Sequence, residues 1–269
     1  MTSSKRVILA MLGFIVSISV VFATRADEII QQDMLRNVLT KNGAEGAFVG
    51  YDVAAGRMFL INASRALQRF SPASTFKIAN SLIALETGVI KDENEIIPYR
   101  SDDLPLFKEW PRDMSMRDAI KMSNVPIYQE LARRVGLARY REWLARLSYG
   151  NGEISEAINR FWLDGSLAIS AVEQVYFITA LAQRKLPMSI RSQDIVRDIL
   201  KYETVGDHRI YAKTGWCAAC RPQIGWWVGW VERKGRIFAF ALNIDIARPE
   251  DLDKRIPIAR EFLSKLDAL

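Results

Sequence analysis

The chain of 269 residues is 49% hydrophobic and 25% charged, and no repeat, low-complexity tract or Pro/Gly/Ser linker divides it, so we expect one compact soluble body. The formal net charge is +6; without residues 1–26 it falls to +3, because 34 basic residues then face 31 acidic ones. No basic block with interleaved aromatic residues accompanies this excess, which excludes a nucleic-acid-binding protein.

The first 26 residues differ from the rest of the chain. Two basic residues precede an apolar run over residues 7–22, and small residues up to Ala26 offer a cleavage site, an order typical of a secretory signal peptide. An uncleaved anchor is the alternative, but this run is short for a bilayer span of about 20 residues. We therefore expect residues 1–26 to be a cleaved signal peptide, and residues 27–269 to be a periplasmic domain without stable membrane association.

Short elements open the mature chain. A short helix is expected around residues 28–40. The apolar stretches 46–53 and 57–62 flank Ala54-Ala55-Gly56, and this pattern predicts a β-hairpin.

A buried helix is predicted to begin just before Ser74 and to end at Gly88. Ser71 is a favourable cap, Pro72 suits the first turn, and apolar residues then cover most of the helix circumference, as in a core helix. Ser74 and Lys77 are three residues apart, so they share one helical face with Cβ atoms about 5–6 Å apart. The hydroxyl and the amine are therefore expected within hydrogen-bond reach of each other.

The surroundings of this pair give it chemical meaning. Ser74 would lie in the first helical turn, where free backbone N–H groups favour an anion. Lys77 would point into an apolar interior, where desolvation favours the neutral amine. A neutral amine beside a hydroxyl can activate that hydroxyl as a nucleophile. Ser-x-x-Lys also occurs by chance, so the apolar context of Lys77, not the spacing alone, makes the pair a candidate site.

The middle of the chain, to about residue 201, reads as helical. Capping boxes at Ser115 and Ser170 open two helices, and further helices are expected over residues 126–135 and 138–147. Strands then return over residues 209–213, 225–231 and 236–244, and the Arg233-Lys234-Gly235 turn is expected to join the last two as a hairpin. A C-terminal helix is expected over residues 250–266. We predict an α/β (α+β) fold, with an antiparallel sheet from both ends of the chain, flanking helices and an inserted all-helical region.

The single histidine and the two cysteines were weighed as candidate centres. As the single histidine, His208 is the one that a Ser-His-Asp triad would have to use. It begins a strand pattern, so it is interpreted as a surface strand residue. Cys217 and Cys220 form Cys-Ala-Ala-Cys between strands, whereas a redox pair normally opens a helix. A local disulfide or two free thiols are favoured over a redox centre. Two sulfurs and one histidine predict no metal site.

Three further short motifs follow Ser-x-x-Lys in order. They are Ser123-Asn124-Val125 after one helix, Tyr149-Gly150-Asn151 after another, and Lys213-Thr214-Gly215 at the end of a late strand. Together the four motifs resemble the class D (oxacillinase) beta-lactamases within the serine penicillin-recognising superfamily, over roughly residues 45–265. Residues 27–269 are then expected to form a beta-lactamase domain of the penicillin-binding transpeptidase-like fold.

The resemblance implies roles for the catalytic group. Ser74 would be the acylated nucleophile, and Lys77 the general base, working as a carbamate (N6-carboxylysine) formed with carbon dioxide or bicarbonate. No other cofactor is implied. Trp162 would donate its indole N–H to the carbamate, and Ser123 would relay a proton to the leaving nitrogen. Lys213 completes the catalytic set.

The resemblance also implies how the substrate is held. The substrate carboxylate would meet Lys213, Thr214 and Arg255, and Gly215 lets a ligand approach the strand edge closely. Backbone N–H groups of Ser74 and Trp216 would form the oxyanion hole. The apolar walls would be Val125 and Trp110, with a plain core role as the alternative for Trp110.

The implied function is hydrolysis of the beta-lactam ring of penicillin-type antibiotics through a serine acyl-enzyme, which confers resistance. The partners are small-molecule beta-lactams, and the protein is expected to be a monomer or a homodimer. The alternatives are a penicillin-binding transpeptidase or carboxypeptidase, and a non-catalytic beta-lactam sensor domain.

Overall fold

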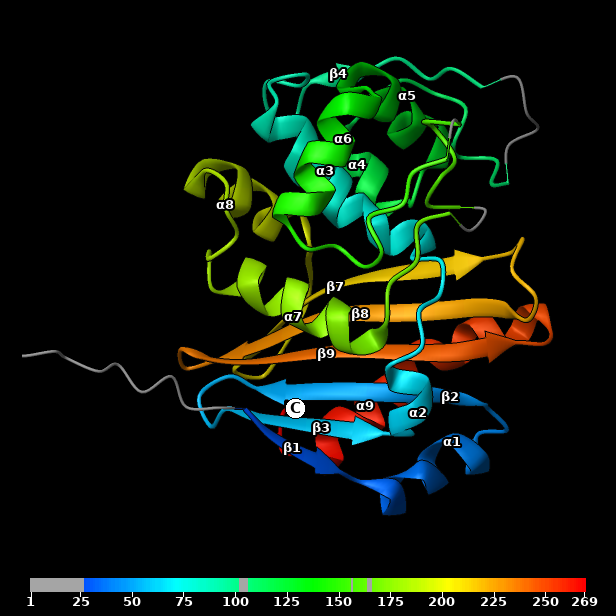
Figure 1. The fold of residues 1–269 in the computed structure, drawn as a ribbon, viewed down its shortest axis with the longest axis vertical. Helices are drawn as coiled ribbons and strands as arrows, with labels where there is room; N and C mark the ends of the chain where they lie inside the picture. The colour runs from blue at the N-terminus through cyan, green and yellow to red at the C-terminus, as the bar shows by residue number, and fades with distance from the viewer. Residues whose placement is uncertain (1–26, 102–105, 156, 164–165) are drawn as a thin grey trace, which may run out of the picture.

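A seven-stranded sheet runs through the molecule, in the order β1-β3-β2-β9-β8-β7-β6 (Figure 1). The computed structural model describes residues 27–101, 106–155, 157–163 and 166–269, so the expected signal peptide lies outside the described residues. β1 pairs with β3 in parallel, and the other neighbouring strands pair antiparallel. The strands are β1 (Glu28–Gln31), β2 (Gly46–Asp52), β3 (Arg57–Ile61), β6 (Lys201–Val205), β7 (His208–Cys217), β8 (Gln223–Arg233) and β9 (Arg236–Ile246).

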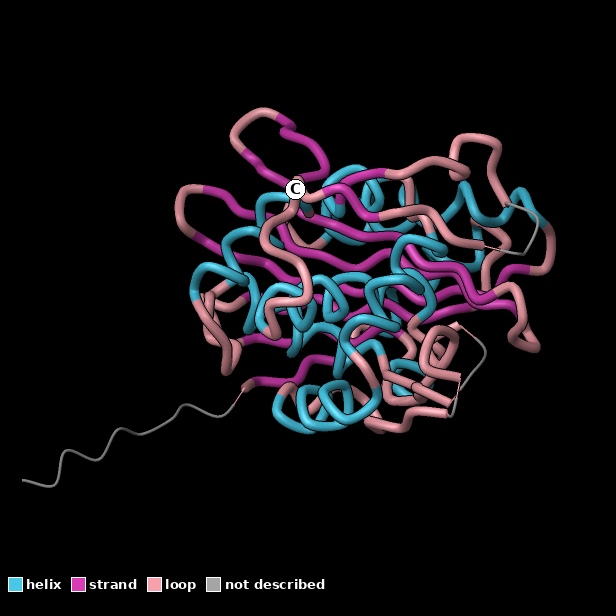
Figure 2. The backbone as a smooth tube through the Cα atoms, turned by 90° about the horizontal axis from the view of Figure 1, so that it is seen from above, coloured by secondary structure: helices cyan, strands magenta, loops and turns pink. Residues whose placement is uncertain are grey.

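Helices lie on both faces of the sheet (Figures 1 and 2). α1 and α9 cover one face, α7 covers the other, and α3 to α6 with α8 form a helical region beside β7. The bounds are α1 (Asn37–Lys41), α2 (Ala63–Ala66), α3 (Lys77–Glu86), α4 (Met116–Lys121), α5 (Val125–Val135), α6 (Leu137–Arg146), α7 (Ala171–Ala182), α8 (Ile190–Ile199) and α9 (Arg255–Lys265). Among the described residues, no helix is both long and apolar enough to cross a bilayer.

The sheet separates two hydrophobic cores. Successive strand residues point to opposite faces, so in β2 the side chains of Ala47 and Val49 join the core beneath the helical region, while Phe48 joins the core under α9. Phe48 stacks on Phe262 of α9 with ring centroids 4.7 Å apart. Because both faces are covered, β2 is buried along its whole length.

The predicted architecture is confirmed. The sheet takes strands from both ends of the chain, and the helical region is inserted between them. Both predicted hairpins form, with Gly56 and Gly235 in the left-handed region at φ 64° and 79°. Ser170 and Glu173 make the complete capping box of α7, whereas at Ser115 the Asp118 carboxylate accepts from the Ser115 hydroxyl instead.

Several element boundaries were wrong. The helix expected over residues 28–40 is instead β1, a 3-10 turn η1 (Asp33–Arg36) and α1, because parallel pairing with β3 outweighs local helix propensity. β6 was not anticipated, since it has little apolar alternation and its residues are largely exposed. The C-terminal helix begins with a 3-10 turn η3 (Pro249–Lys254).

The chain around Ser74 also differs from the prediction. A 3-10 turn η2 (Ala73–Phe76) precedes α3, and Ala73 has a φ of 47°. Ser71 does not cap this helix, because its hydroxyl donates to the carbonyl oxygen of Trp162 over 2.9 Å. Ser74 therefore lies in the tight turn before α3, and Lys77 is the first residue of that helix. Gly88, at φ 69°, follows the helix end as expected.

Candidate active site

Ser74 and Lys77 meet at the junction of η2 and α3. The Nζ of Lys77 donates a hydrogen bond to the Oγ of Ser74 over 2.8 Å, which confirms the predicted proximity. Lys77 is fully buried, while Ser74 is partly exposed. The pair thus presents a hydroxyl to solvent with an amine behind it.

Burial controls the charge of Lys77. Desolvation lowers the pKa of this amine well below its ordinary value, and the nearby Lys213 lowers it further by like-charge repulsion. The ring of Tyr128, on α5, lies 5.3 Å from Nζ. Among the described residues, Ser74 is the hydrogen-bond partner of the Lys77 amine, and burial favours the neutral form of that amine.

Ser123 and Lys213 form a second hydroxyl–amine pair. Ser123 lies between α4 and α5 with φ 53°, and its neighbour Asn124 caps α5 by accepting from the Ile127 N–H. The Nζ of Lys213 donates to the Oγ of Ser123 over 2.9 Å and to the carbonyl oxygen of Thr214 over 3.1 Å. The sequence motifs alone did not show that these two side chains would touch.

The charge of Lys213 depends on its burial. Burial lowers its pKa to about 7, and repulsion from Arg255 acts in the same direction. In the free protein this amine is therefore close to half protonated at neutral pH. An anion placed beside it favours the protonated form.

The free edge of β7 borders η2. β6 pairs with β7 only as far as Tyr211, so residues 213–217 lie beyond the last pair. A Cβ on Gly215 would lie 3.0 Å from Thr75 Cγ2 and 3.1 Å from the Pro72 carbonyl oxygen. A side chain here would crowd η2, so Gly215 allows the strand to pack closely against η2. The predicted role of this glycine was close approach of a ligand.

The residues assigned to carboxylate binding lie along this edge. Arg255, the first residue of α9, donates from Nη1 to the Gly215 carbonyl oxygen over 2.8 Å. Thr214 and Trp216 are partly exposed, and the Trp216 indole N–H donates to Gln223 over 3.0 Å. Lys213 and Thr214 therefore lie close to Arg255 of α9 at this end of β7.

Trp162 is buried against the helix that carries Lys77. Its ring lies 5.4 Å from that of Phe76 and 5.0 Å from that of Phe161, measured between centroids. The indole Nε1 is buried and has no hydrogen-bond partner among the described residues. A buried donor without a partner is costly, so this N–H fits an acceptor that none of the described residues supplies.

The Tyr149-Gly150-Asn151 motif fixes the loop that carries Trp162. The Asn151 side chain accepts from the Ala168 N–H over 3.0 Å and donates to the Ser166 carbonyl oxygen over 2.9 Å. Gly150 has φ 56°, and a Cβ there would lie 2.1 Å from the Ala168 carbonyl oxygen. The motif therefore acts on the site through the loop.

Two apolar candidates lie near Ser123. Val125 begins α5 and is partly exposed. Trp110 is only 5% exposed, donates to the Met122 carbonyl oxygen over 3.2 Å and accepts from Asn124 over 3.0 Å. These contacts favour the core alternative for Trp110, which supports the Ser123 turn from behind.

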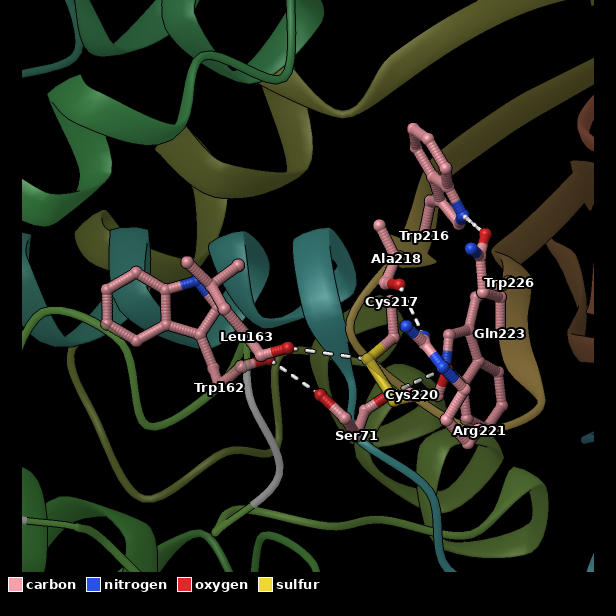
Figure 3. Close-up of a disulfide and its surroundings, with 10 residues drawn as sticks. All are labelled: Ser71, Trp162, Leu163, Trp216, Cys217, Ala218, Cys220, Arg221, Gln223 and Trp226. Atoms are coloured by element: carbon pink, nitrogen blue, oxygen red, sulfur yellow. Dashed lines mark hydrogen bonds between the residues drawn. A yellow bond between two sulfur atoms is a disulfide. The ribbon is translucent and has the colours of Figure 1, made fainter. Parts of the chain in front are cut away.

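The structure distinguishes between the alternatives for the two cysteines and shows where the histidine lies. Cys217 and Cys220 form a disulfide at the end of β7 (Figure 3). His208 begins β7, as expected for a strand residue, and its Nδ1 lies 3.2 Å from the Asp207 carboxylate.

Sequence reasoning missed several residues that shape the site. The Tyr128 ring lies beside Lys77, and the Ser71 hydroxyl donates to the carbonyl oxygen of Trp162. Both contacts join residues far apart in the sequence, and no local pattern predicts them. Asn151 was singled out only as part of a motif. The position of Tyr149-Gly150-Asn151 directly after a predicted helix was the sequence signal for a structural role of Asn151.

Comparison with known proteins places this site in a family. The family described as the penicillin binding protein transpeptidase domain matches residues 55–264. The chain is 42% identical over 226 residues to "Beta-lactamase OXA-48" of Klebsiella pneumoniae, which covers 84% of this chain and 85% of that protein. It is 41% identical to "Beta-lactamase OXA-10" of Pseudomonas aeruginosa, covering 76% of each chain.

A solved structure agrees. The class D beta-lactamase FUS-1 (OXA-85) of Fusobacterium nucleatum subsp. polymorphum has a TM-score of 0.85 and 40% identity, covering 89% of this chain and 99% of that chain. The chain belongs to the class D beta-lactamases. The resemblance drawn from the four motifs is confirmed, and so is the assignment as a serine beta-lactamase of class D.

Proposed function

We propose that this class D beta-lactamase hydrolyses the beta-lactam ring of penicillin-type antibiotics through an acyl-enzyme on Ser74, with Lys77 as the general base. One observation carries the proposal: the Nζ of a fully buried Lys77, whose pKa is lowered by that burial, lies 2.8 Å from the Ser74 hydroxyl. No carboxylate is recorded within hydrogen-bond distance of Ser74, Lys77 or Ser123 among the described residues. The base is therefore built on the lysine.

The same residues fit a carbamate on Lys77. Carbon dioxide adds through its carbon to an unprotonated amine, one amine proton leaves to water, and the resulting anionic group can accept a proton. Burial keeps Lys77 unprotonated, and the unpartnered Nε1 of Trp162 offers a hydrogen bond to an anion there. Carbon dioxide or bicarbonate is the only small molecule this chemistry requires.

The first half-reaction acylates Ser74. The Ser74 hydroxyl gives its proton to the modified Lys77 side chain as Oγ attacks the lactam carbonyl carbon. Backbone N–H groups of Ser74 and Trp216 are the proposed donors to the developing oxyanion. Ser123, hydrogen-bonded to Lys213, hands a proton to the leaving lactam nitrogen, and the ring opens.

The second half-reaction removes the acyl group. Water, deprotonated at Lys77, attacks the ester carbonyl carbon, and the bond to Ser74 Oγ breaks with return of the proton to that oxygen. The substrate carboxylate is held by Lys213, Thr214 and Arg255, whose proximity supports this assignment. Val125 would contact the apolar side of the substrate.

We also propose that residues 1–26 are a signal peptide and that residues 27–269 work in the periplasm, where a beta-lactamase would intercept antibiotics. The basic, apolar and small-residue order of residues 1–26 supports this. The apparent mass of the purified protein on a calibrated gel-filtration column distinguishes a monomer from a homodimer.

Turnover tests the proposed function. Protein purified after expression of the full chain should hydrolyse many equivalents of a penicillin, and added bicarbonate should raise the rate. Ser74→Ala should abolish hydrolysis. A single stoichiometric burst followed by silence would instead indicate a transpeptidase or a sensor, and hydrolysis by Ser74→Ala would remove the proposed nucleophile.

A further inference from the structure

The Cys217–Cys220 disulfide lies against the loop that carries Trp162 (Figure 3). Cys217 is 1% exposed, and its Sγ lies 3.3 Å from the carbonyl oxygen of Leu163. A disulfide sulfur has no hydrogen to donate, so this is a close packing contact of a polarisable atom. It joins the last residue of β7 to the residue that follows Trp162.

A second contact holds the neighbouring carbonyl. The Ser71 hydroxyl donates to the carbonyl oxygen of Trp162 over 2.9 Å, and Ser71 is itself fixed because its carbonyl accepts from the Trp226 indole over 2.9 Å. Two consecutive carbonyls of the loop are therefore held, one by the chain entering η2 and one by the disulfide. Fixing both peptide units restricts the direction in which the Trp162 side chain leaves the backbone.

The disulfide holds the Cys217 sulfur in a buried position beside a turn whose other residues are largely exposed. Ala218 and Ala219 are exposed, and between them they offer no side chain that could pack on the Trp162 loop. Arg221 donates to the carbonyl oxygens of Ala218 and Cys220, over 3.1 and 2.7 Å, so the closed turn is also braced on its outer side. Within this turn, Cys217 makes the contact with Leu163.

We propose that Cys217, held by its disulfide to Cys220, is a positioning residue for Trp162, and that it thereby sets how readily Lys77 is carbamylated. This rests on the proposed base chemistry of Lys77. Cys217 acts through Leu163 and Trp162, since its Sγ packs against the Leu163 carbonyl oxygen. Loss of the contact lets the indole N–H move away from the group it would hold.

The test measures carbamylation directly. The starting protein and the Cys217→Ala/Cys220→Ala variant are equilibrated with ¹³C-bicarbonate, and the carbamate resonance is followed against bicarbonate concentration. Loss of a supporting partner typically weakens a held group by about tenfold or more, so we expect about a tenfold higher half-saturating bicarbonate in the variant. At saturating bicarbonate, the resonance and kcat should recover.

Two further variants separate the contact from the ring. Cys217→Ser/Cys220→Ala lacks the disulfide, but its hydroxyl can donate to the Leu163 carbonyl, so it should recover part of the bicarbonate affinity. Ala219→Ser, in the same exposed turn, keeps the disulfide and should match the starting protein. If the alanine pair does not fold, Cys217→Val/Cys220→Ala fills the buried position and replaces it in the comparison.

The outcomes are distinct. An unchanged half-saturating bicarbonate in a folded alanine or valine variant overturns the positioning role, whatever its melting temperature. No carbamate resonance in the starting protein would instead defeat the proposed base chemistry of Lys77. A raised half-saturating bicarbonate with partial rescue by serine supports the positioning role.

Discussion

Two buried lysines with lowered pKa values stand behind two serines in this site, and their burial does different work. Lys77 is fully buried, and burial lowers the pKa of its amine well below the ordinary value, which fits a base. Lys213, with a pKa of about 7, lies beside Arg255 at the end of β7 and changes charge near neutral pH. Lys213 also lowers the pKa of Lys77 by like-charge repulsion, so the charge of Lys213 affects the titration of Lys77.

The charge of Lys213 predicts a pH dependence. For a substrate carboxylate, kcat/KM should fall as pH rises through about 7, because the free protein then loses the Lys213 charge. In Lys213→Arg the guanidinium stays protonated, so this falling limb should disappear even if activity is lower. Profiles are measured at saturating bicarbonate. The same falling limb in both proteins would assign it to another group.

The charge of Lys77 predicts a stability effect. Its folded pKa lies well below the unfolded value of 10.5, so below 10.5 the unfolded state binds more protons and folding is penalised. Lys77→Met removes this penalty. Its melting temperature in buffer free of carbon dioxide should exceed that of the starting protein at pH 7, and the difference should shrink as pH approaches 10.5, while turnover is lost. A difference that grew with pH would contradict the neutral lysine.

At the scale of elements, the site depends on loops that are fixed by strand and helix ends. Trp162 lies in the segment between α6 and α7, which is tied to the chain before η2 by a bridge between Phe70 and Ile169. Asn151 ties the other end of that segment. The position of the indole is thus set by backbone contacts several residues away.

Gly150 tests this dependence, with Gly152 as a matched control. Both have positive φ, 56° and 66°, but a Cβ on Gly150 would lie 2.1 Å from a backbone oxygen, whereas a Cβ on Gly152 meets nothing within 4 Å. Gly152→Ala should cost about 1–2 kcal/mol from its backbone conformation alone. Gly150→Ala should cost about 2–5 kcal/mol, because overpacking adds to the same strain. Denaturant unfolding measures both; equal losses would show that the contact with Ala168 is unimportant.

The helices, strands and turns could be predicted from the sequence only in part. The hairpins were found because Gly56 and Gly235 mark turns between apolar strands, and the capping box at Ser170 is a local signal. β1 was missed because its pairing partner, β3, lies further along the chain. β6 was missed because its residues are largely exposed. Ser71 was misread as a cap because its true partner, the Trp162 carbonyl, is 91 residues away.

At the scale of the whole molecule, the sheet separates the core next to Ser74 and Lys77 from the core under α9. The core under α9 contains Phe48 and Phe262, while Phe76, Tyr128 and Trp162 belong to the core beneath the helical region, next to the site. Motif order in the sequence indicated the site residues, yet it could not show which core supports them.

Phe262 tests this division. It is fully buried against Phe48, so Phe262→Ala should lower the free energy of unfolding by about 3–5 kcal/mol. Below the melting transition, its half-saturating bicarbonate and kcat should match the starting protein. A shift in either value in the folded variant would show that the two cores are coupled.

The role of Lys77 is tested most directly by the lifetime of the Ser74 acyl-enzyme without carbon dioxide. The protein is depleted of carbon dioxide, mixed with a penicillin, and followed by intact mass. We predict that any acylated protein persists, with the added mass on Ser74, and clears rapidly when bicarbonate is supplied. Clearance at the same rate with and without bicarbonate would contradict a carbamylated Lys77 as the base.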